Sequence, residues 1–379
     1  DDEILTYLPL CHIAERVFSA WLPIAHGATI NFAESPATVA QNLQELSPTY
    51  IFAVPRVWEK FYSRITTAIS DATWFGRQAY NLAIAVGMRR AGKLIAGQRP
   101  SLLDNVLYGI ADRLVLRNVK KLLGLDRAHS AASGAAPISP SLLKWFLAIG
   151  LPIDELWGQT ELGIITTTRK GVYRLGTVGA AVPGTEIRID DNGEIISRSL
   201  GQFDGYLNLP EKTAETIIDG WVHTGDVGEL DDEGYLTITD RLKDIIITAG
   251  GKNITPSVME NELKFSPYIS DAVVIGDARK YLTCLVMIDQ ENVEHYAQTH
   301  SVPFTDYRSL CAQTEIVDLI GTEVARVNKE FSSVEQVKKF RLIDVLLTAE
   351  DEELTPTMKL KRNFVSDKYS GLIDSMYGK

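Results

Sequence analysis

The densest group of residues that could bind a nucleotide is the segment Trp157-Gly158-Gln159-Thr160-Glu161. The indole of Trp157 offers a flat face on which an adenine could stack, and Gly158 would let the backbone approach a ligand. Thr160 could donate a hydrogen bond to an α-phosphate, and Glu161 suits Mg²⁺, a hard cation that prefers carboxylate and phosphate oxygens. The alternative is a tryptophan that closes a core at the end of a strand, with Glu161 capping the next element. A motif this short does not decide between the two by itself.

Two further residues suit the sugar and phosphate of the same ligand. Asp226, in Thr224-Gly225-Asp226, has a carboxylate that can accept two hydrogen bonds from a ribose diol. Arg241 follows fifteen residues later and could add a charge-assisted hydrogen bond to a ribose or phosphate oxygen. The alternative is an exposed Asp–Arg ion pair, which is common and contributes little.

Two glycine-containing segments could form loops that contact a ligand. Ser133-Gly134-Ala135-Ala136-Pro137 has only small side chains, as backbone contact with a purine edge requires. In isolation it is more simply a strand-to-helix turn, and only its predicted position beside Trp157 makes it a site candidate. Gly250-Gly251-Lys252 is not a Walker phosphate loop, because isoleucine and Asn253 stand where that motif needs glycine and Ser or Thr.

Composition narrows the class of protein. The chain has 379 residues, enough for two or more domains with cores of their own, and apolar and charged residues make up ordinary fractions of 45% and 23%. A net charge of −11 argues against nucleic acid as a partner. The three cysteines, Cys11, Cys284 and Cys311, suggest neither a disulfide framework nor a zinc site. Cysteines without a disulfide pattern fit a reducing cytoplasm best. No apolar run approaches the length of a membrane-spanning helix.

The order of predicted elements places the candidate segments at one sheet edge. Residues 49–54 read as a buried strand, and a long helical tract covers residues 57–124. Residues 129–132, 139–149 and 152–156 read as a strand, a crossover helix and a parallel strand. Gly134 and Trp157 then follow the carboxyl ends of neighbouring strands, where ligands bind in open α/β sheets.

Two hairpins and a compact α+β pattern follow. The first hairpin turns at Asp191-Asn192-Gly193 and the second at residues 231–234. Beyond Lys243 we expect a helix at residues 257–264 and strands at residues 272–275 and 283–288. The prediction is an α/β fold in which residues 1–242 form a large domain, with an antiparallel β subdomain at residues 175–242. Residues 243–379 form a small mobile α+β domain.

Taken in order, these segments, with Asp240-Arg241-Leu242-Lys243-Asp244 and Thr355-Pro356-Thr357-Met358-Lys359, resemble the acyl-adenylate-forming superfamily. Within it the chain resembles the long-chain fatty acyl-CoA ligases, over nearly all of its length. That family also has a Gly/Ser/Thr-rich loop ending in Pro-Lys-Gly, which holds the ATP β- and γ-phosphates, and this chain has no such segment. Because the chain also begins at Asp1 without Met, we expect a fragment that lacks its N-terminal part.

The resemblance implies a role for each matching residue. It gives the 157–161 segment nucleotide and Mg²⁺ contacts, Asp226 the ribose hydroxyls and Arg241 an assisting role. The Gly250-Gly251 turn would admit CoA, and Lys243 would be the hinge of the small domain. Lys359 would neutralise charge at the α-phosphate during adenylation, with Lys361 as the alternative because a shortened loop leaves the register open. His12 matches a segment that lines the acyl site, although a lone histidine is as often structural.

The resulting hypothesis is an AMP-forming long-chain fatty acid–CoA ligase that uses ATP, Mg²⁺ and coenzyme A. A second hypothesis is an adenylating ligase for another acid, or one that passes the acyl group to a carrier-protein thiol. A third, from another class, is a nucleotide-binding module without turnover. Acyl length, oligomeric state and peripheral membrane association are left open by the sequence.

Overall fold

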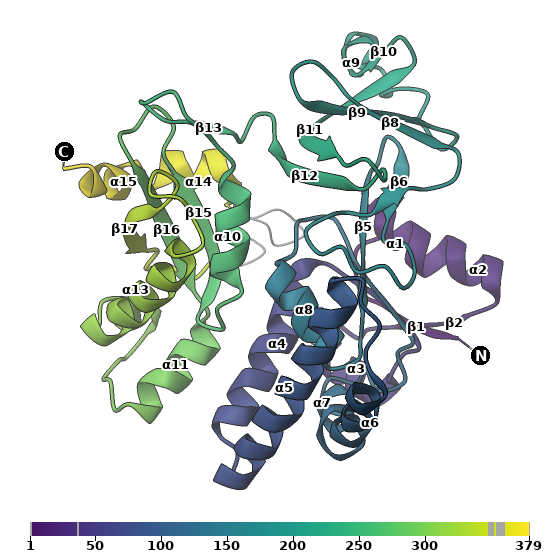
Figure 1. Ribbon diagram of the computed structural model, residues 1–379. Coiled ribbons are helices and arrows are strands. Elements are labelled where there is room, and N and C mark those ends of the chain that lie inside the picture. The colour runs from purple at the N-terminus through teal and green to yellow at the C-terminus, as the bar shows by residue number, and fades with distance from the viewer. Residues whose placement is uncertain (1, 36–37, 348–351, 354–360, 379) are drawn as a thin grey trace. The chain divides into compact units, whose positions relative to one another are not determined.

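The computed structural model describes residues 2–35, 38–347, 352–353 and 361–378. Contacts divide the chain into two compact units. Unit 1 comprises residues 1–61 and 68–238, and unit 2 comprises residues 62–67 and 239–379. In Figure 1 unit 1 is mostly purple to teal and unit 2 is green to yellow. The contact boundary lies before Thr239, and the domain boundary at Lys243 stays a proposal.

The main sheet of unit 1 has seven strands in the order β2-β1-β3-β4-β5-β6-β7. The strands are β1 (Glu3–Thr6), β2 (Thr29–Phe32), β3 (Tyr50–Ala53), β4 (Ser130–Ser133), β5 (Ile153–Gln159), β6 (Gly163–Thr167) and β7 (Ala180–Ala181). The pairs from β2 to β5 are parallel, whereas β6 is antiparallel to both β5 and β7. The sheet therefore changes direction at the segment that carries Trp157.

Helices connect the parallel strands. They are α1 (Ile13–Arg16), the π-helix η1 (Val17–Trp21), α2 (Leu22–His26), α3 (Val39–Leu46), α4 (Pro55–Ser70), α5 (Trp74–Ile95), α6 (Leu102–Ala111), the π-helix η2 (Asp112–Leu116), α7 (Arg117–Leu122) and α8 (Pro140–Ala148). The long helical tract predicted at residues 57–124 is thus confirmed as several helices. The α8 crossover is confirmed too, with Pro140 in its first turn and the Ser139 hydroxyl accepting from the Ser141 N–H.

A second, antiparallel sheet in unit 1 contains both predicted hairpins. Its strands are β8 (Thr185–Ile189), β9 (Glu194–Ser199), β10 (Ile217–Ile218), β11 (Trp221–Leu230) and β12 (Leu236–Arg241), and α9 (Pro210–Thr216) precedes β10. The order is β10-β11-β9-β8, and β12 pairs with β11. At the first hairpin turn Gly193 has a φ of +84°, which glycine adopts without strain, and Asn192 accepts from the Glu194 N–H.

Unit 2 is built on a three-stranded sheet covered on both faces. The strands are β15 (Ile269–Ile275), β16 (Leu282–Ile288) and β17 (Val337–Leu342), and a small hairpin joins β13 (Ile246–Ile247) to β14 (Asn253–Ile254). The helices are α10 (Pro256–Lys264), α11 (Gln290–Thr299), α12 (Tyr307–Cys311), α13 (Thr314–Asn328), α14 (Arg362–Lys368) and α15 (Ser370–Met376). Alternate residues of β16 enter two different cores, Cys284 with Met259 and Leu285 with Val365, so the whole strand is buried. No helix among the described residues of either unit is long and apolar enough to span a membrane.

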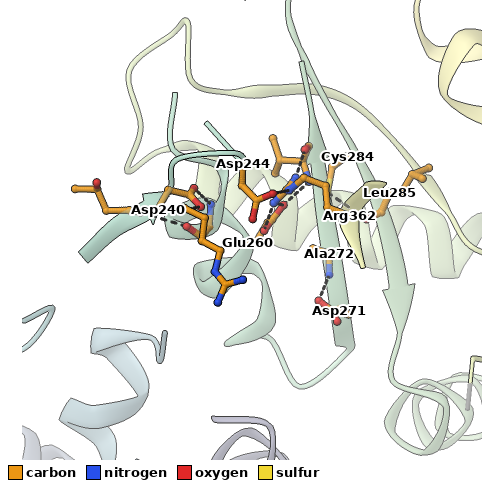
Figure 2. A network of polar contacts seen from close by, with 12 residues as sticks. Asp240, Asp244, Glu260, Asp271, Ala272, Cys284, Leu285 and Arg362 are labelled. Atoms are coloured by element: carbon orange, nitrogen blue, oxygen red, sulfur yellow. Dashed lines mark hydrogen bonds and ion pairs between the residues drawn. The ribbon is translucent and has the colours of Figure 1, made fainter. Parts of the chain in front are cut away.

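A buried ion pair ties α14 to the rest of unit 2 (Figure 2). Arg362 donates from Nη2 to both carboxylate oxygens of Glu260, at 2.7 and 2.8 Å, and from Nη1 to the Val274 carbonyl at 2.7 Å. The Val274 N–H donates in turn to Glu260. Burial raises the pKa of Glu260, and the Arg362 charge opposes that rise. Asp244 lies 3.9 Å from Arg362 Nε. The first residue of α14 is therefore held by α10 and β15.

We predict that Glu260→Ala lowers the free energy of unfolding of unit 2 by about 3 kcal/mol, because the largely buried Arg362 charge loses its bidentate partner and keeps only Asp244 at 3.9 Å. Urea denaturation of the chain, followed by circular dichroism, measures the effect. Asp344→Ala is the control, since it removes the partner of Arg308 from an exposed pair in the same unit and should cost less than about 1 kcal/mol. Equal losses in both variants would contradict the prediction.

Candidate functional site

The segment of residues 157–161 forms the end of β5 and the turn into β6. Trp157, Gly158 and Gln159 belong to the strand, which runs three residues beyond its predicted end. The strand continues because Trp157 and Gly158 pair with Thr166 and Ile164 of the antiparallel β6. Thr160 is exposed at the turn. The motif is thus one edge of a hairpin rather than a loop beyond a strand.

The structure explains the glycine at position 158 differently from the sequence prediction. A Cβ at this position would lie 2.1 Å from the carbonyl oxygen of Gly163 on β6. The expectation that Gly158 lets the backbone approach a ligand is therefore not needed to explain the residue, because the opposing strand already excludes a side chain.

Trp157 packs in a core and holds the carboxylate of Asp226. The side chain is 8% exposed and lies in a cluster with Leu162, Ile195 and Val222. Its Nε1 donates to Asp226 Oδ2 at 3.0 Å. This burial agrees with the alternative, a strand-end tryptophan that closes a core, and stacking of an adenine on the ring stays a prediction. The indole N–H holds the Asp226 carboxylate by a hydrogen bond.

Gln159 completes the link between the two predicted segments. Its Nε2 donates to the carbonyl oxygen of Thr224 at 2.8 Å and to Asp226 Oδ2 at 3.2 Å. Two donors from β5 therefore converge on one carboxylate oxygen of β11, and Asp226 is only 7% exposed. Hydrogen bonds thus join two segments that lie more than sixty residues apart in the sequence.

The backbone that carries Asp226 is held from the other side by β9. Gly225 lies within β11 where the pairing with β9 shifts register, an irregularity that we call the Gly225 turn. Gly225 has a φ of +71°, and its N–H donates to Glu194 Oε1 at 2.8 Å. Glu194 Oε2 lies 2.9 Å from Nδ1 of His223, and the Thr224 hydroxyl donates to the Ile195 carbonyl at 2.6 Å. Glu194 is buried, so its two oxygens brace the Gly225 turn from within the sheet.

Asp190 joins Glu194 and His223 in a group whose candidate ligand atoms all lie within 4.8 Å of one another. Both carboxylate oxygens of Glu194 already have hydrogen-bond partners in that group and at Gly225. The arrangement is explained by its support of the turn, and we assign no metal to it.

Glu161 is held at the turn by a tyrosine from a later segment. The Tyr206 hydroxyl donates to Glu161 Oε1 at 2.7 Å, and the Phe203 N–H donates to the Glu161 carbonyl at 2.8 Å. Burial, followed by this hydrogen bond, raises the pKa of Tyr206. The tyrosine thus stays a donor, and the half-buried carboxylate is oriented at the exposed end of the hairpin.

The segment of small residues lies directly beside the end of β5. Ser133, the last residue of β4, pairs with Glu155, which confirms the predicted position next to Trp157. A Cβ at Gly134 would lie 3.1 Å from the Leu156 carbonyl oxygen, so this glycine is pressed against β5. Ala135 is exposed with a φ of +69°, a strained conformation for a residue with a Cβ. Ala136, half-buried, follows it. Backbone strain of this kind concentrates at functional sites.

The remaining candidate residues belong to unit 2. Arg241 ends β12 with an exposed side chain, and Lys243 is exposed in a turn closed by the Asp244 N–H donating to the Arg241 carbonyl at 2.9 Å. Gly250 and Gly251 form the exposed turn between β13 and β14, where Gly251 has a φ of +76°. Lys361 is exposed just before α14. Lys359 lies outside the described residues.

His12 has a structural function in unit 1. It is the N-cap of α1, where its Nδ1 accepts from the Ala14 N–H at 3.2 Å. Burial lowers the pKa of His12, which favours the neutral ring that this acceptor role requires. The contact agrees with the structural alternative, and contact with an acyl group stays a prediction.

Two family models match parts of the chain. Residues 1–207 match the AMP-binding enzyme model, and residues 243–379 match the AMP-binding enzyme C-terminal domain. The chain belongs to the AMP-binding enzyme family. Relatives of this family member include fadD11, assigned to the fatty-acid–CoA ligases, and the long-chain-fatty-acid–CoA ligase FadD15, both of Mycobacterium tuberculosis. The identities are 38% over 99% of this chain and 35% over all of it. The chain spans 66% and 62% of these relatives' length.

A solved structure confirms the fold of this AMP-binding enzyme chain. The A domain of a carboxylic acid reductase from Segniliparus rugosus, in complex with AMP and a co-purified carboxylic acid, has a TM-score of 0.70 at 22% identity. The likeness covers all of this chain and 55% of that one. The predicted α/β class with an added antiparallel sheet is therefore confirmed.

Sequence reasoning missed three residues that support the candidate site of this AMP-binding enzyme. Glu194, His223 and Tyr206 contact the predicted residues or their backbone only in the folded chain. The one signal for Glu194 is an acidic residue directly after a hairpin turn, which is usually exposed. His223 adjoins Thr224 in the sequence and could have been included with it.

We predict that Glu194→Ala weakens AMP binding about tenfold, because the Gly225 turn loses its buried acceptor. Glu194→Gln keeps an acceptor oxygen and should bind AMP almost as the unmodified chain does. Isothermal titration with AMP measures both. The control is Glu186→Ala on the neighbouring strand β8, whose exposed carboxylate pairs with Arg198. Unchanged affinity in Glu194→Ala, with the fold intact, would show that the turn does not depend on this residue.

Proposed function

We propose that the protein activates a long-chain fatty acid with ATP to form acyl-AMP and pyrophosphate, and that the CoA thiol then displaces AMP. It would thus be an AMP-forming acid–thiol ligase. The proposal is supported by the family, by relatives named for this reaction and by one geometric observation. That observation is the convergence of Trp157 and Gln159 on Asp226, which joins two predicted nucleotide-binding segments at one place in unit 1.

In the proposed reaction Asp226 accepts hydrogen bonds from the ribose hydroxyls. Its carboxylate cannot rotate freely, because Trp157 and Gln159 hold one of its oxygens. A carboxylate oriented in advance loses less entropy when the diol binds. Arg241 assists at a ribose or phosphate oxygen, and the exposed Thr160 donates to the α-phosphate. The backbone at Gly134, Ala135 and Ala136 faces the purine edge.

Glu161 suits Mg²⁺ in its chemistry. Magnesium sites with nucleotides commonly use one or two protein carboxylates together with phosphate oxygens. Glu161 is half-buried at the hairpin end and is oriented by Tyr206 through only one of its oxygens. When bound, the ion would neutralise phosphate charge. Glu161 would hold it, and Tyr206 would keep that carboxylate in place.

The two half-reactions would use different parts of unit 2. Lys359 would serve adenylation, and the Gly250-Gly251 turn would serve attack by CoA. These segments lie more than a hundred residues apart, so we propose that the domain turns between steps about Lys243. Lys243 suits a hinge because its side chain is exposed and it lies in a turn between β12 and β13.

The experiment that tests the function is an assay of AMP release with ATP, CoA and acids of graded chain length. A long-chain ligase should release AMP fastest with the longer acids of the series and more slowly with short ones. Preference for another acid, or transfer only to a carrier protein, would favour the second hypothesis. AMP binding without product would leave a nucleotide-binding module.

For Lys359 we predict that Lys359→Ala slows acyl-AMP formation about 10² or more, because the ammonium stabilises charge that grows in the transition state. Thioester formation from supplied acyl-AMP should be nearly unchanged. Lys361→Ala is the matched control. If Lys361→Ala alone has the effect, or if both half-reactions fall together, the assignment of Lys359 is wrong.

For the hinge we predict that Lys243→Pro keeps much of the adenylation rate but loses most thioester formation. Proline would fix φ near −65° at residue 243 and restrict Leu242 as well. Pyrophosphate release and acyl-CoA formation from supplied acyl-AMP are measured separately. Lys243→Ala is the control, because it removes the charge and leaves the backbone free. Equal loss of both activities in Lys243→Pro, with an unchanged circular dichroism spectrum, would refute the hinge.

A further inference from the structure

Glu353 is a buried acidic residue directly before the segment that contains Lys359. Its side chain is 1% exposed, although its neighbour Glu352 is exposed. The carboxylate forms an ion pair with Lys368, the last residue of α14, and the carbonyl oxygen accepts from the Lys361 N–H at 2.8 Å. An acidic side chain is seldom buried without a partner, so the ion pair explains why this carboxylate can be buried.

The helix α14 is fixed on unit 2 without help from Glu353. Its first residue, Arg362, is bound by Glu260, and Val365 in its middle is fully buried against Val273. These contacts hold the helix at its start and in its core. Glu353 is therefore not needed to keep α14 in place, and its two contacts act on the chain that precedes the helix.

The contacts of Glu353 bring together the two ends of the segment of residues 354–360. Seven residues separate Glu353 from Lys361 in the sequence, yet a hydrogen bond joins the two. Lys359 lies two residues before Lys361, so covalent geometry keeps their Cα atoms within about 7 Å of each other. A segment held at both ends has fewer conformations than one held at a single end. Fixing Glu353 therefore narrows the positions open to Lys359.

The ion pair with Lys368 links the end of α14 to a residue beside its start. A helix of seven residues is about 10 Å long, and its side chains lean toward its N-terminus. Lys368 can therefore extend back along the helix to Glu353, which is hydrogen-bonded to Lys361. The Lys368 side chain is about half exposed, so a substitution there leaves the buried face of α14 intact.

We propose that Glu353 is a positioning residue for the adenylation step, and that it acts by holding the two ends of the segment that carries Lys359. Stabilisation of transition-state charge depends steeply on position, and a displacement of about 1 Å can cost about 10² in rate. The proposal rests on the proposed function, because the role of Lys359 is part of that function. The contacts of Glu353 need no turnover, so the two proposals can fail separately.

The first test is limited digestion by trypsin, with cleavage after Lys359 and Lys361 identified by mass spectrometry. Glu353→Ala should speed this cleavage about tenfold, because the ends of the segment are released. Lys368→Met should do the same, since it keeps much of the lysine stem but removes the charge. The two substitutions combined should have no larger effect than either alone, because they break one interaction.

The second test follows the two half-reactions in the same variants. Glu353→Ala should lower kcat for acyl-AMP formation about tenfold and change KM for ATP less than about twofold. Thioester formation from supplied acyl-AMP should stay nearly unchanged. Glu353→Gln keeps an acceptor for Lys368 and should retain most of the adenylation rate. Circular dichroism checks the fold of each variant.

The control is Asp344→Asn, which removes the charge from the exposed pair with Arg308 in the same unit. It should leave cleavage and both half-reactions as they are in the unmodified chain. Unchanged cleavage in Glu353→Ala, or faster cleavage with full adenylation, would overturn the proposal. So would an equal fall of both half-reactions, which would indicate a general loosening of unit 2. If the unmodified chain forms no acyl-AMP, the proposed function fails, and cleavage alone decides whether Glu353 holds the segment.

Discussion

The hydrogen bonds that Asp226 accepts from Trp157 and Gln159 are the contact on which the candidate site depends. They join the main sheet to the antiparallel sheet of unit 1 through a buried carboxylate, which must be satisfied wherever it is placed. Glu194 stabilises the backbone next to Asp226, because it accepts a hydrogen bond from the Gly225 N–H. A buried polar network of this kind specifies one geometry, because each member would be costly to leave without its partner.

Unit 2 has a counterpart of this network in Glu260 and Arg362. There the buried charges hold the start of α14, which follows the segment that contains Lys359. The two networks differ in kind. The first holds a carboxylate at the candidate site, whereas the second fixes the start of α14 against a core. The second network also reaches the turn that contains Lys243, because Asp244 lies 3.9 Å from Arg362 Nε, while the side chain of Lys243 itself is exposed.

Apolar and turn signals predicted most elements, whereas polar contacts between distant segments escaped prediction. Residues 50–53 form a strand because β-branched and aromatic residues end at a proline, and Ser139 with Pro140 starts α8. The burial of Trp157 has no periodic signature, because it depends on the approach of a second sheet. Gly158 illustrates the same limit, because the carbonyl oxygen of Gly163 on the opposite strand leaves no room for a side chain at this position. In the sequence Glu194 resembles an ordinary exposed acidic residue. Its burial and its contact with Gly225 arise only in the folded chain.

The three candidate segments of unit 1 contain no positive charge of their own. The candidate segments of unit 1, at residues 133–137, 157–161 and 224–226, contain two carboxylates and no lysine or arginine. A nucleotide triphosphate would meet repulsion there unless cations come from elsewhere. The lysines and arginines of residues 74–122 gather on helices instead of these segments, and the proposed cations Arg241 and Lys359 both belong to unit 2. The proposed reaction therefore depends on cations outside these three segments, and Lys359 is the one assigned to the adenylation step.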